Sequence, residues 1–368
     1  MKEKAIEFIN IIENSGYKAY IVGGFVRDDI LGIESTDIDI TTNATPKAIK
    51  TIFDNIKSKK GVEESSYGSI MVNYKNVIFE VTTFRLESEY LDNRHPSSIQ
   101  YVDDLETDLK RRDFTINTIC LDKDAKIIDL LNGRKDLNKK IIRTIKDSKQ
   151  SFKDDALRIL RAVRFSVTLN FKLDKEVVEA IKECKIYLKN ISYERKKTEL
   201  DKIFASKNAS YGISLLKKLD LIDSLELNNI NRVKDYTDLI GIWSMINSDV
   251  YKFTKVEKDL INKVNIVYEM DNLDPKILYK YGLYVNILAG VNKGINKKKI
   301  IYAYDNLPIK SKKDIDIKAD EICKILNKNP DRFLNIIFKD LENLILSKKI
   351  VNKKEEIIKY IKNNYFNS

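Results

Sequence analysis

The chain has 368 residues, of which 43% are hydrophobic, and a formal net charge of +11. This length predicts roughly two to four sub-domains, and the basic charge favours a polyanionic partner, with nucleic acid ahead of a membrane surface. No stretch reaches the roughly 18 consecutive apolar residues of a membrane span, and no signal peptide is expected.

The rarity of sulfur and imidazole ligands restricts the kind of metal site. The three cysteines, Cys120, Cys184 and Cys323, lie far apart, so neither a disulfide framework nor a zinc knuckle is supported. Reduced thiols in a cytoplasmic protein are expected instead. His95 is the single histidine, which excludes a His-rich metal site and an HD-type phosphohydrolase. A metal site must therefore be built from carboxylates, which favour a hard cation such as Mg²⁺.

Residues 1–140 are predicted to form an α/β head. Apolar runs bounded by glycine, proline and asparagine predict strands, and amphipathic runs predict helices. In chain order we expect a helix at 5–14, a strand at 19–24, a helix ending near Gly32, a strand at 37–42, a helix beginning at Pro46, two strands joined at Lys75–Asn76, a polar stretch at 85–104, a helix around 111–121 and a strand at 126–133.

From Ile141 onward the strand signals fade, and helical patterns continue to the C-terminus. Residues 151–169, SFKDDALRILRAVRFSVTL, predict one long amphipathic helix. Turns are expected at Asn170, near Asn190, at Lys207–Asn208 and around Gly294. The predicted fold class is therefore α+β, with an α/β head followed by an all-helical remainder.

Asp37 and Asp39 are the first candidates for chemistry. They lie two residues apart in a predicted strand, so both carboxylates point to one face of the sheet. Two carboxylates this close repel each other unless a cation lies between them. The pair suits two Mg²⁺ ions, one activating an attacking hydroxyl and the other neutralising a leaving pyrophosphate. The alternative is a solvated strand end, because a lone Asp-x-Asp is common.

Glu80 strengthens the case for a metal site. It interrupts the apolar run Val77–Val81, where a carboxylate is costly unless it is paired or bound to a metal. It is a candidate third metal ligand or a support for the other two acids. The alternative is an edge-strand glutamate that faces water.

Gly23 and Gly24 join a predicted strand to the helix that carries Arg27. Glycine lets the backbone approach a phosphate closely, and the N-terminus of a helix favours negative charge. Arg27 adds a forked donor for a triphosphate. The alternative is an ordinary tight turn, and the fingerprints of the P-loop and Rossmann folds are absent.

Four segments of the chain carry a family resemblance. They are VGGFVRDDILG with TDIDITTNATP, LKRRDFTIN at 109–117, DDALRILRAVRF at 154–165 and YERKKTEL at 193–200. In this order they resemble the motifs of class II tRNA nucleotidyltransferases and bacterial poly(A) polymerases. The resemblance implies a polymerase-β-like nucleotidyltransferase head at 1–140, a base-recognising neck at 141–205 that the fourth motif stabilises, a body at 206–275 and a tRNA-binding tail at 276–368.

Asp155 and Arg158 are three residues apart on the predicted helix, so their side chains are neighbours. A carboxylate can accept from the amino group of cytosine or adenine while an arginine donates to the ring acceptor beside it. Uracil and guanine carry a carbonyl in that place and would be rejected. The resemblance implies this role for the pair, and nucleotide contact for Arg161 and Arg164. For Arg164 the alternatives are a solvated basic stripe and a pair with a neighbouring acid.

The second motif, LKRRDFTIN, implies further nucleotide contacts. Arg112 would support the triphosphate, and Asp113 and Asn117 could meet the ribose. The competing view of Asp113 is an ordinary acid at the start of a helix. The chain departs from the family pattern at Asp154, where glutamate is usual, and at His95, where arginine is usual.

The resemblance implies a CCA tRNA nucleotidyltransferase. Such an enzyme adds C, C and A to the 3′ end of tRNA from CTP and ATP, by two-metal, in-line attack of the 3′-hydroxyl on the α-phosphate with release of pyrophosphate. A partial enzyme that adds only CC or only A, and a bacterial poly(A) polymerase, are the alternatives. The arginine-rich strand of the poly(A) polymerases is absent. The segment 85–99 resembles the loop needed for A addition, with Tyr90, Asp92, Arg94 and Pro96.

Two other classes of protein explain less of the sequence. A non-catalytic RNA-binding module would not need Asp37, Asp39 and Glu80 together. A small-molecule nucleotidyltransferase shares the Asp-x-Asp head but does not explain the second and third motifs or the long helical part. We therefore expect a cytoplasmic monomer or homodimer that binds tRNA, ATP and CTP, with no membrane partner.

Overall fold

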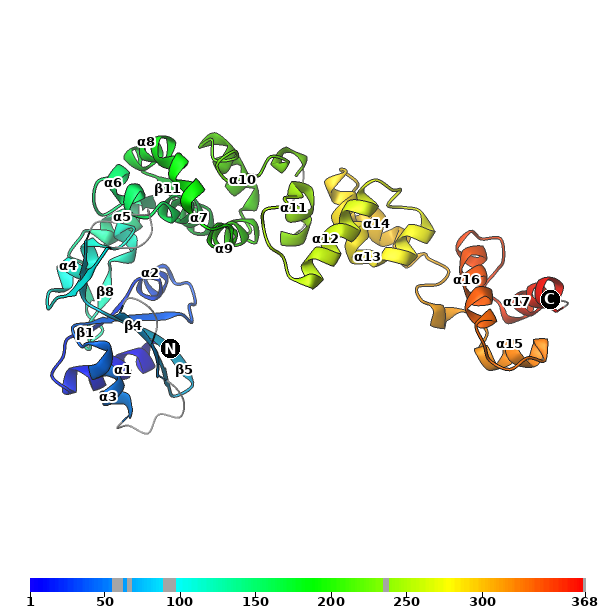
Figure 1. The fold of residues 1–368 in the computed structure, drawn as a ribbon, viewed down its shortest axis with the longest axis horizontal. Coiled ribbons are helices and arrows are strands. Elements are labelled where there is room, and N and C mark those ends of the chain that lie inside the picture. The colour runs from blue at the N-terminus through cyan, green and yellow to red at the C-terminus, as the bar shows by residue number, and fades with distance from the viewer. Residues whose placement is uncertain (55–61, 65–67, 89–96, 234–237, 367–368) are drawn as a thin grey trace. The chain divides into compact units, whose positions relative to one another are not determined.

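A computed structural model describes residues 1–54, 62–64, 68–88, 97–233 and 238–366. They form two compact units, Met1–Glu226 and Leu227–Ser368, whose elements can be followed in Figure 1. The boundary between the units falls inside the segment 206–275. Over these residues, no helix combines the length and the apolar character that a membrane span requires.

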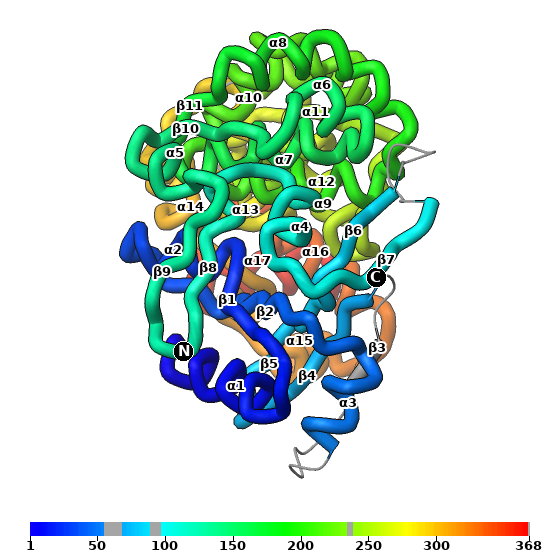
Figure 2. Tube along the Cα trace, turned by 90° about the vertical axis from the view of Figure 1, so that its left-hand side faces the viewer, coloured from blue at the N-terminus to red at the C-terminus, as the bar shows by residue number. Residues whose placement is uncertain are grey.

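A mixed sheet organises the first unit. Within the described residues its strand order is β3-β4-β5-β2-β1-β8-β9. β2 and β5 pair in parallel, with Asp39 opposite Glu80, whereas the neighbouring pairs are antiparallel. β2 and β5 thus bring together two acids from separate parts of the sequence (Figure 2). The strands are β1 (Ala19–Val22), β2 (Ile38–Thr42), β3 (Val62–Glu64), β4 (Ser69–Tyr74), β5 (Val77–Thr83), β8 (Cys120–Leu121) and β9 (Ile127–Ile128).

Helices α1 (Lys2–Asn14) and α3 (Pro46–Asp54) pack against one face of this sheet. The ring of Phe8 in α1 stacks between Phe53 of α3 and Phe79 of β5, at centroid distances of 4.4 and 4.1 Å. Because side chains alternate along a strand, Phe79 facing α1 turns Glu80 to the opposite face. The buried side of α1 has the three- and four-residue spacing of one helix face: Ala5, Phe8, Ile9 and Ile12.

The rest of the first unit is mainly helical. Two strands of two residues each, β10 (Ile141–Ile142) and β11 (Lys172–Leu173), pair in parallel among the helices. The predicted α+β class is confirmed, and this strand pair is an addition to the helical part. The helices are α2 (Gly24–Leu31), α4 (Leu105–Lys110), α5 (Gly133–Lys139), α6 (Ser148–Asp154), α7 (Leu157–Leu169), α8 (Lys175–Cys184), α9 (Tyr193–Phe204) and α10 (Ala209–Lys218), with 3-10 turns η2 (Thr115–Asn117) and η3 (Lys185–Asn190).

The single helix predicted over 151–169 is wrong. The chain leaves helical geometry at Asp155, whose φ of −137° and ψ of 102° are extended, so α6 and α7 are separate helices. Asp155 Oδ1 accepts a hydrogen bond from the Leu157 backbone N–H at 3.1 Å. A short acidic side chain that bonds to nearby backbone competes with the helical ladder, which accounts for the break.

The helix predicted around 111–121 is also wrong. Helix α4 ends at Lys110, and the chain continues through η2 into β8. The backbone N–H of Thr115 donates to the Arg143 carbonyl at 3.0 Å, a tertiary bond in place of a helical one. This contact lies 28 residues away along the sequence, so the local pattern gave no sign of it.

A short antiparallel ribbon occupies part of the stretch predicted only as polar. β6 (Arg85–Glu87) pairs with β7 (Ile99–Tyr101), and the Ser88 N–H donates to the Ser98 carbonyl at 3.2 Å. Figure 2 shows the two strands side by side. The loop residues that the sequence singled out lie outside the described part of the chain: Tyr90, Asp92, Arg94, His95 and Pro96.

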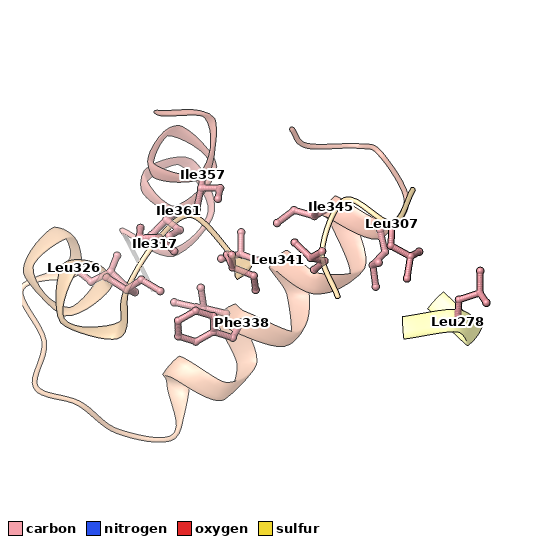
Figure 3. Close-up of a cluster of buried hydrophobic side chains, with 14 of the residues drawn as sticks. Leu278, Leu307, Ile317, Leu326, Phe338, Leu341, Ile345, Ile357 and Ile361 are labelled. Atoms are coloured by element: carbon pink, nitrogen blue, oxygen red, sulfur yellow. The ribbon is translucent and has the colours of Figure 1, made fainter. Parts of the chain in front are cut away.

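The second unit is helical throughout its described part. Phe338, Leu341 and Ile345 of α16 share a buried cluster with Ile357 and Ile361 of α17 (Figure 3). The long helix α13 is kinked at Gly282, whose φ of 76° glycine tolerates. The helices are α11 (Leu239–Ile246), α12 (Lys255–Tyr268), α13 (Pro275–Asn292), α14 (Lys297–Asp305), α15 (Ala319–Leu326), α16 (Phe333–Leu346) and α17 (Lys354–Tyr365), with turns η4 (Ile230–Arg232) and η5 (Lys312–Asp314).

The stacked position of Phe8 predicts its contribution to stability. Phe8→Ala removes a fully buried ring and should destabilise the first unit by about 3–5 kcal/mol, measured by urea unfolding. Phe366→Ala is the control, because that ring is 60% exposed; it should change the free energy of unfolding by under about 0.5 kcal/mol. A loss below about 1 kcal/mol for Phe8→Ala would contradict this account of the core.

Candidate active site

A cavity of about 1320 Å³ is lined by side chains from β2, β5, α2 and α7 among others. Asn117 contributes to its lining, as do Glu87 and Arg111, which the sequence did not place in the site. Every residue that the sequence predicted for catalysis or nucleotide binding lines this cavity: Gly24, Arg27, Asp37, Asp39, Glu80, Arg112, Asp113, Asp155, Arg158, Arg161 and Arg164.

The acidic floor of the cavity comes from two adjacent strands. Asp37 precedes β2, Asp39 lies within it, and Glu80 is the register partner of Asp39 on β5. Burial raises the pKa of Asp39 to about 6, the nearby Glu80 and Asp37 carboxylates add to the rise, and Arg112 and Arg161 oppose it. The acids therefore repel one another, and a cation placed among them would relieve that repulsion.

The donors of this floor fit a hard divalent cation. In the described part of the chain, no three His, Cys, Asp or Glu side chains already converge on one point. The donors available are carboxylate oxygens, which are the ligands that Mg²⁺ and similar ions prefer. Asp37 and Asp39 are the residues that would hold such an ion. The charge and oxygen chemistry fit, and the ion would draw the carboxylates together.

Gly23 and Arg112 leave room beside the acids for an anionic group. Gly23 has a φ of 78°, and a Cβ there would lie 3.2 Å from Asp39 Oδ2 and 3.8 Å from Arg112 Nη1. Only glycine combines this backbone conformation with that closeness. Arg112 Nε is buried and has no hydrogen-bond partner among the described residues. An unused buried donor next to a glycine cradle suits an oxyanion such as a phosphate.

A chain of hydrogen bonds links the second motif to α2 and α7. Arg27 Nη1 donates to Asn117 Oδ1 at 2.7 Å, and Asn117 Nδ2 donates to Asp113 Oδ1 at 2.9 Å. Arg161 Nε donates to Asp113 Oδ2 at 2.7 Å. Burial alone would raise the pKa of Asp113, but the Arg161 guanidinium and the Asn117 hydrogen bond outweigh it and hold that pKa well below its usual range.

Asp155 and Arg158 reach the cavity from different backbone settings. Asp155 lies in the extended link before α7, where its Oδ2 is 3.7 Å from Arg195 Nη2. Arg158 lies in α7 and donates to Ser151 Oγ at 2.9 Å and to the Arg111 carbonyl at 2.7 Å. Burial raises the pKa of Asp155, although Arg195 and Arg158 oppose the rise. The prediction that both lie on one helix is wrong, yet both still face the same cavity.

The remaining arginine of the third motif pairs with an acid. Arg164 Nε donates to Glu199 Oε2 at 2.6 Å. A pair with an acid was one of the two alternatives that the sequence left open for Arg164, and the residue also lines the cavity. Its guanidinium lies 4.0 Å from the centroid of the Phe165 ring, and those of Arg27 and Arg161 lie 5.0 and 5.4 Å from it. Asp154, the departure from the family, pairs with Lys146 and accepts from Gln150 at 2.8 Å.

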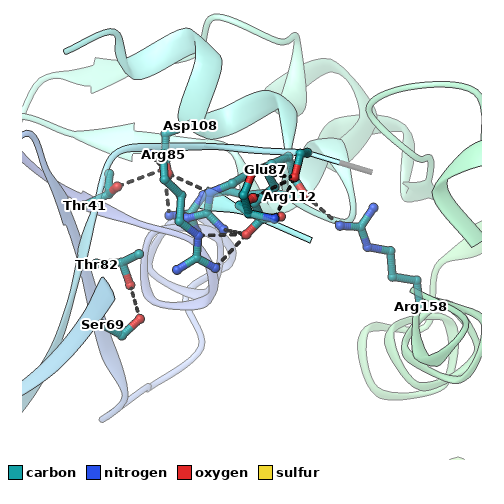
Figure 4. Close-up of polar contacts among 11 residues, drawn as sticks. Thr41, Ser69, Thr82, Arg85, Glu87, Asp108, Arg112 and Arg158 are labelled. Atoms are coloured by element: carbon teal, nitrogen blue, oxygen red, sulfur yellow. Dashed lines mark hydrogen bonds and ion pairs between the residues drawn. The ribbon is translucent and has the colours of Figure 1, made fainter. Parts of the chain in front are cut away.

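Sequence reasoning missed the acid that organises the second motif. Asp108 is fully buried and accepts from Thr41 Oγ1 at 2.9 Å and Arg112 Nη2 at 3.3 Å (Figure 4). Burial would raise the pKa of Asp108, but Arg112 and Arg111 outweigh it and lower that pKa. One signal was present in the sequence: Asp108 precedes Arg111 and Arg112 by three and four residues, the spacing of ion pairs on a helix.

Three sequence families match successive parts of the chain. The Poly A polymerase head domain matches residues 19–143, the RNA and SrmB-binding site of polymerase A matches 170–229, and tRNA nucleotidyltransferase domain 2 matches 248–361. A mixed sheet with paired acids, followed by these helical parts, defines a nucleotidyltransferase. Members of this class use divalent metal ions.

Curated relatives narrow the class. The CCA-adding enzyme of Staphylococcus haemolyticus is 35% identical, with 96% of each chain covered. That of Bacillus subtilis is 33% identical, covering 98% of this chain and 97% of its own. The crystal structure of the Bacillus stearothermophilus CCA-adding enzyme in complex with CTP has a TM-score of 0.78 at 25% identity, covering 98% of this chain and 96% of that one.

This chain belongs to the family of CCA-adding enzymes, within the poly(A) polymerase nucleotidyltransferases. The family, the enzyme class and the fold that the sequence motifs predicted are confirmed by these matches. The four motifs were sufficient to predict the family because each has its residue types at fixed spacing, and together they follow the family's order.

The ion pair of Asp113 gives a pH-dependent prediction. Its pKa is lower in the folded chain than the unfolded value of about 4, so the pair stabilises the fold above that pH and loses effect as the pH falls toward the folded pKa. Asp113→Asn should lower the free energy of unfolding by about 3–5 kcal/mol at pH 7 and by roughly 1 kcal/mol less at pH 3. Urea titrations at both pH values measure this, and an equal loss at both would count against the pairing.

Proposed function

We propose that this chain adds C, C and A to the 3′ end of tRNA from CTP and ATP, without a nucleic-acid template. One observation carries the proposal: the acids of β2 and β5 and the base-selecting candidates Asp155 and Arg158 line the same cavity. The proposal is supported by the relatives named CCA-adding enzymes, which match over nearly their whole length.

We assign metal binding to Asp37 and Asp39, with Mg²⁺ as the ion. Bound there, two ions supply an activated 3′-hydroxyl and charge neutralisation for the leaving pyrophosphate. Glu80 keeps a third carboxylate on the same face of the sheet, directly beside Asp39. Asp108 holds Arg112, whose positive charge faces Asp39 and limits the repulsion among the acids.

Triphosphate binding is assigned to the first turn of α2 and the arginines around it. Gly24 begins α2, where unpaired backbone N–H groups and the helix dipole favour an anion. Arg27, Arg112 and Arg161 add positive charge in the cavity. The acceptors of Asp113 are engaged by Asn117, Arg161 and the Phe114 N–H, so we assign it the orientation of these groups toward the nucleotide.

Base selection is assigned to Asp155 and Arg158. The Arg158 guanidinium has five N–H donors and uses two of its nitrogens on Ser151 and Arg111, so donors are left for the ring acceptor of a base. Arg195 near Asp155 favours the ionised carboxylate, which accepts from the amino group of cytosine or adenine. Arg164, held by Glu199, adds positive charge at the edge of this site.

We assign tRNA binding to the helical second unit and part of the first, in the predicted order of neck, body and tail. The second unit carries lysine runs such as Lys297-Lys298-Lys299 at the start of α14, and lysines of this kind bind RNA through its phosphates. We propose that the chain acts in the cytoplasm, as a monomer or homodimer that binds tRNA, CTP and ATP.

A poly(A) polymerase is the second candidate, because the head matches the Poly A polymerase head domain. Product length separates the two functions. We expect three added nucleotides on a tRNA that ends at its discriminator base, with both CTP and ATP required. A long A tail on unstructured RNA would favour the second candidate, and products that stop after CC would indicate a partial enzyme.

The catalytic assignment predicts the effect of Asp39→Ala. Loss of a metal ligand should lower the transfer rate by about 10³-fold or more while leaving tRNA binding intact. Single-turnover extension and filter binding of tRNA measure the two effects. Glu34→Ala removes an exposed acid five residues earlier and should change neither. Normal turnover in Asp39→Ala, or loss of tRNA binding alone, would contradict the assignment.

The base-selection assignment predicts the effect of Arg158→Ala. Losing a forked donor should lower the preference for CTP over UTP by about 10-fold or more. The measurement is kcat/KM for each nucleotide on a tRNA lacking CCA. Arg158→Lys keeps the charge but not the fork, so an intermediate preference is expected. A preference equal to that of the unmodified chain would remove Arg158 from base recognition.

A further inference from the structure

Glu87 is a carboxylate held among cations at the end of the β6–β7 ribbon. Its side chain is only 6% exposed, although it lies in a strand of three residues. Acids are rarely buried unless they are paired. Glu87 Oε1 accepts from Arg85 Nε at 2.7 Å and lies 3.4 Å from Arg111 Nη1. Glu87 therefore ties the ribbon to the end of α4.

Arg111, directly after α4, is held from two sides by acids. Asp108 Oδ1 accepts from Arg111 Nε at 2.8 Å and pairs with its Nη2 at 2.7 Å, while Glu87 pairs with Nη1. Asp108 is in turn bound by the hydroxyl of Thr41, two residues after Asp39 on β2. Figure 4 shows this network of β2, the ribbon and the end of α4. The backbone of Arg111 is thus anchored to the strand that carries the acids.

The anchored backbone of Arg111 holds the base-selecting arginine. Its carbonyl accepts from Arg158 Nη2 at 2.7 Å, and Ser151 Oγ accepts from Nη1 at 2.9 Å. Figure 4 shows Arg158 reaching from α7 to this network. Because a guanidinium is planar, two hydrogen bonds on different nitrogens fix its plane. The position of the Arg111 carbonyl therefore sets where the other donors of Arg158 point.

We propose that Glu87 is a positioning residue for base selection, acting on Arg158 through Arg111. This inference rests on the role proposed for Arg158; Glu87 does not itself touch the base. Without the Glu87 charge, the Arg111 guanidinium keeps its pairing with Asp108 but loses the one with Glu87, so one of the contacts that position the Arg111 backbone is removed. A displacement of about 1 Å at such a group can change a rate by roughly 100-fold. Through Glu87, the β6–β7 ribbon thereby contributes to the selection of the nucleotide.

The test compares Glu87→Gln with Glu106→Gln on a tRNA that ends at its discriminator base. Glu106 lies on α4 and pairs with Lys110, but its side chain is 46% exposed, so it is a matched control. The ratio of kcat/KM for CTP to that for UTP should fall by about 10-fold or more in Glu87→Gln and stay unchanged in Glu106→Gln. An unchanged ratio in Glu87→Gln overturns the proposal.

A double-mutant cycle with Arg158→Ala tests the route. If Glu87 acts through Arg158, adding Glu87→Gln to Arg158→Ala leaves the nucleotide ratio of Arg158→Ala as it was. Additive falls overturn the route, whereas a normal ratio in Arg158→Ala overturns the proposed role of Arg158 instead. Glu87→Asp keeps the charge with a shorter reach and should give a smaller fall. If Glu87→Gln unfolds below the assay temperature, Glu87→Asp replaces it in the test. An unchanged ratio of kcat/KM for CTP to that for UTP in Glu87→Asp then overturns the proposal.

Discussion

The parallel pairing of β2 and β5 places Asp39 directly beside Glu80, and Asp37, two residues before Asp39, lines the same cavity. Like charges on neighbouring strands repel, and burial worsens this by raising the pKa of Asp39 to about 6. This repulsion destabilises the fold, and the packing of α1 and α3 against the apolar face of the same strands offsets it. The repulsion makes the floor a place where a cation is stabilised, and the rest of the cavity supplies the groups that a nucleotide needs around that cation.

Three arginines of the cavity are each held by an acid before any nucleotide arrives. Arg112 is held by Asp108, Arg161 by Asp113 and Arg164 by Glu199. Arginines fixed in this way require little reorganisation when charge develops on a phosphate, which is the main source of electrostatic catalysis. The same pairs keep a cluster of positive charge folded without its substrate. Stability and function therefore depend on the same contacts.

The sequence predicted strands β1, β2, β4, β5 and β9 of the sheet but not β3 or β8. The residues that it named for catalysis and nucleotide binding all line the cavity, because they follow from local alternation and from motifs of fixed spacing. It did not predict the break before α7, since one bond from Leu157 to Asp155 leaves the helical period of the segment unchanged. It missed the β6–β7 ribbon, whose strands have only three residues each, too few for an alternation to stand out from the polar stretch around them. The role of Asp108 was hidden because its partner Thr41 lies 67 residues earlier. Tertiary bonds of this kind leave no periodic signal.

We propose that one cavity joins a metal site on Asp37 and Asp39 to a base site on Asp155 and Arg158, since all four residues line it. A crystal structure with CTP and Mn²⁺, using the anomalous signal of manganese, tests it most directly. We expect manganese on the Asp37 and Asp39 carboxylates, the phosphates near Arg112, and the cytosine amino group within hydrogen-bond distance of the Asp155 carboxylate. Manganese away from both acids, or a cytosine that touches neither Asp155 nor Arg158, would contradict it.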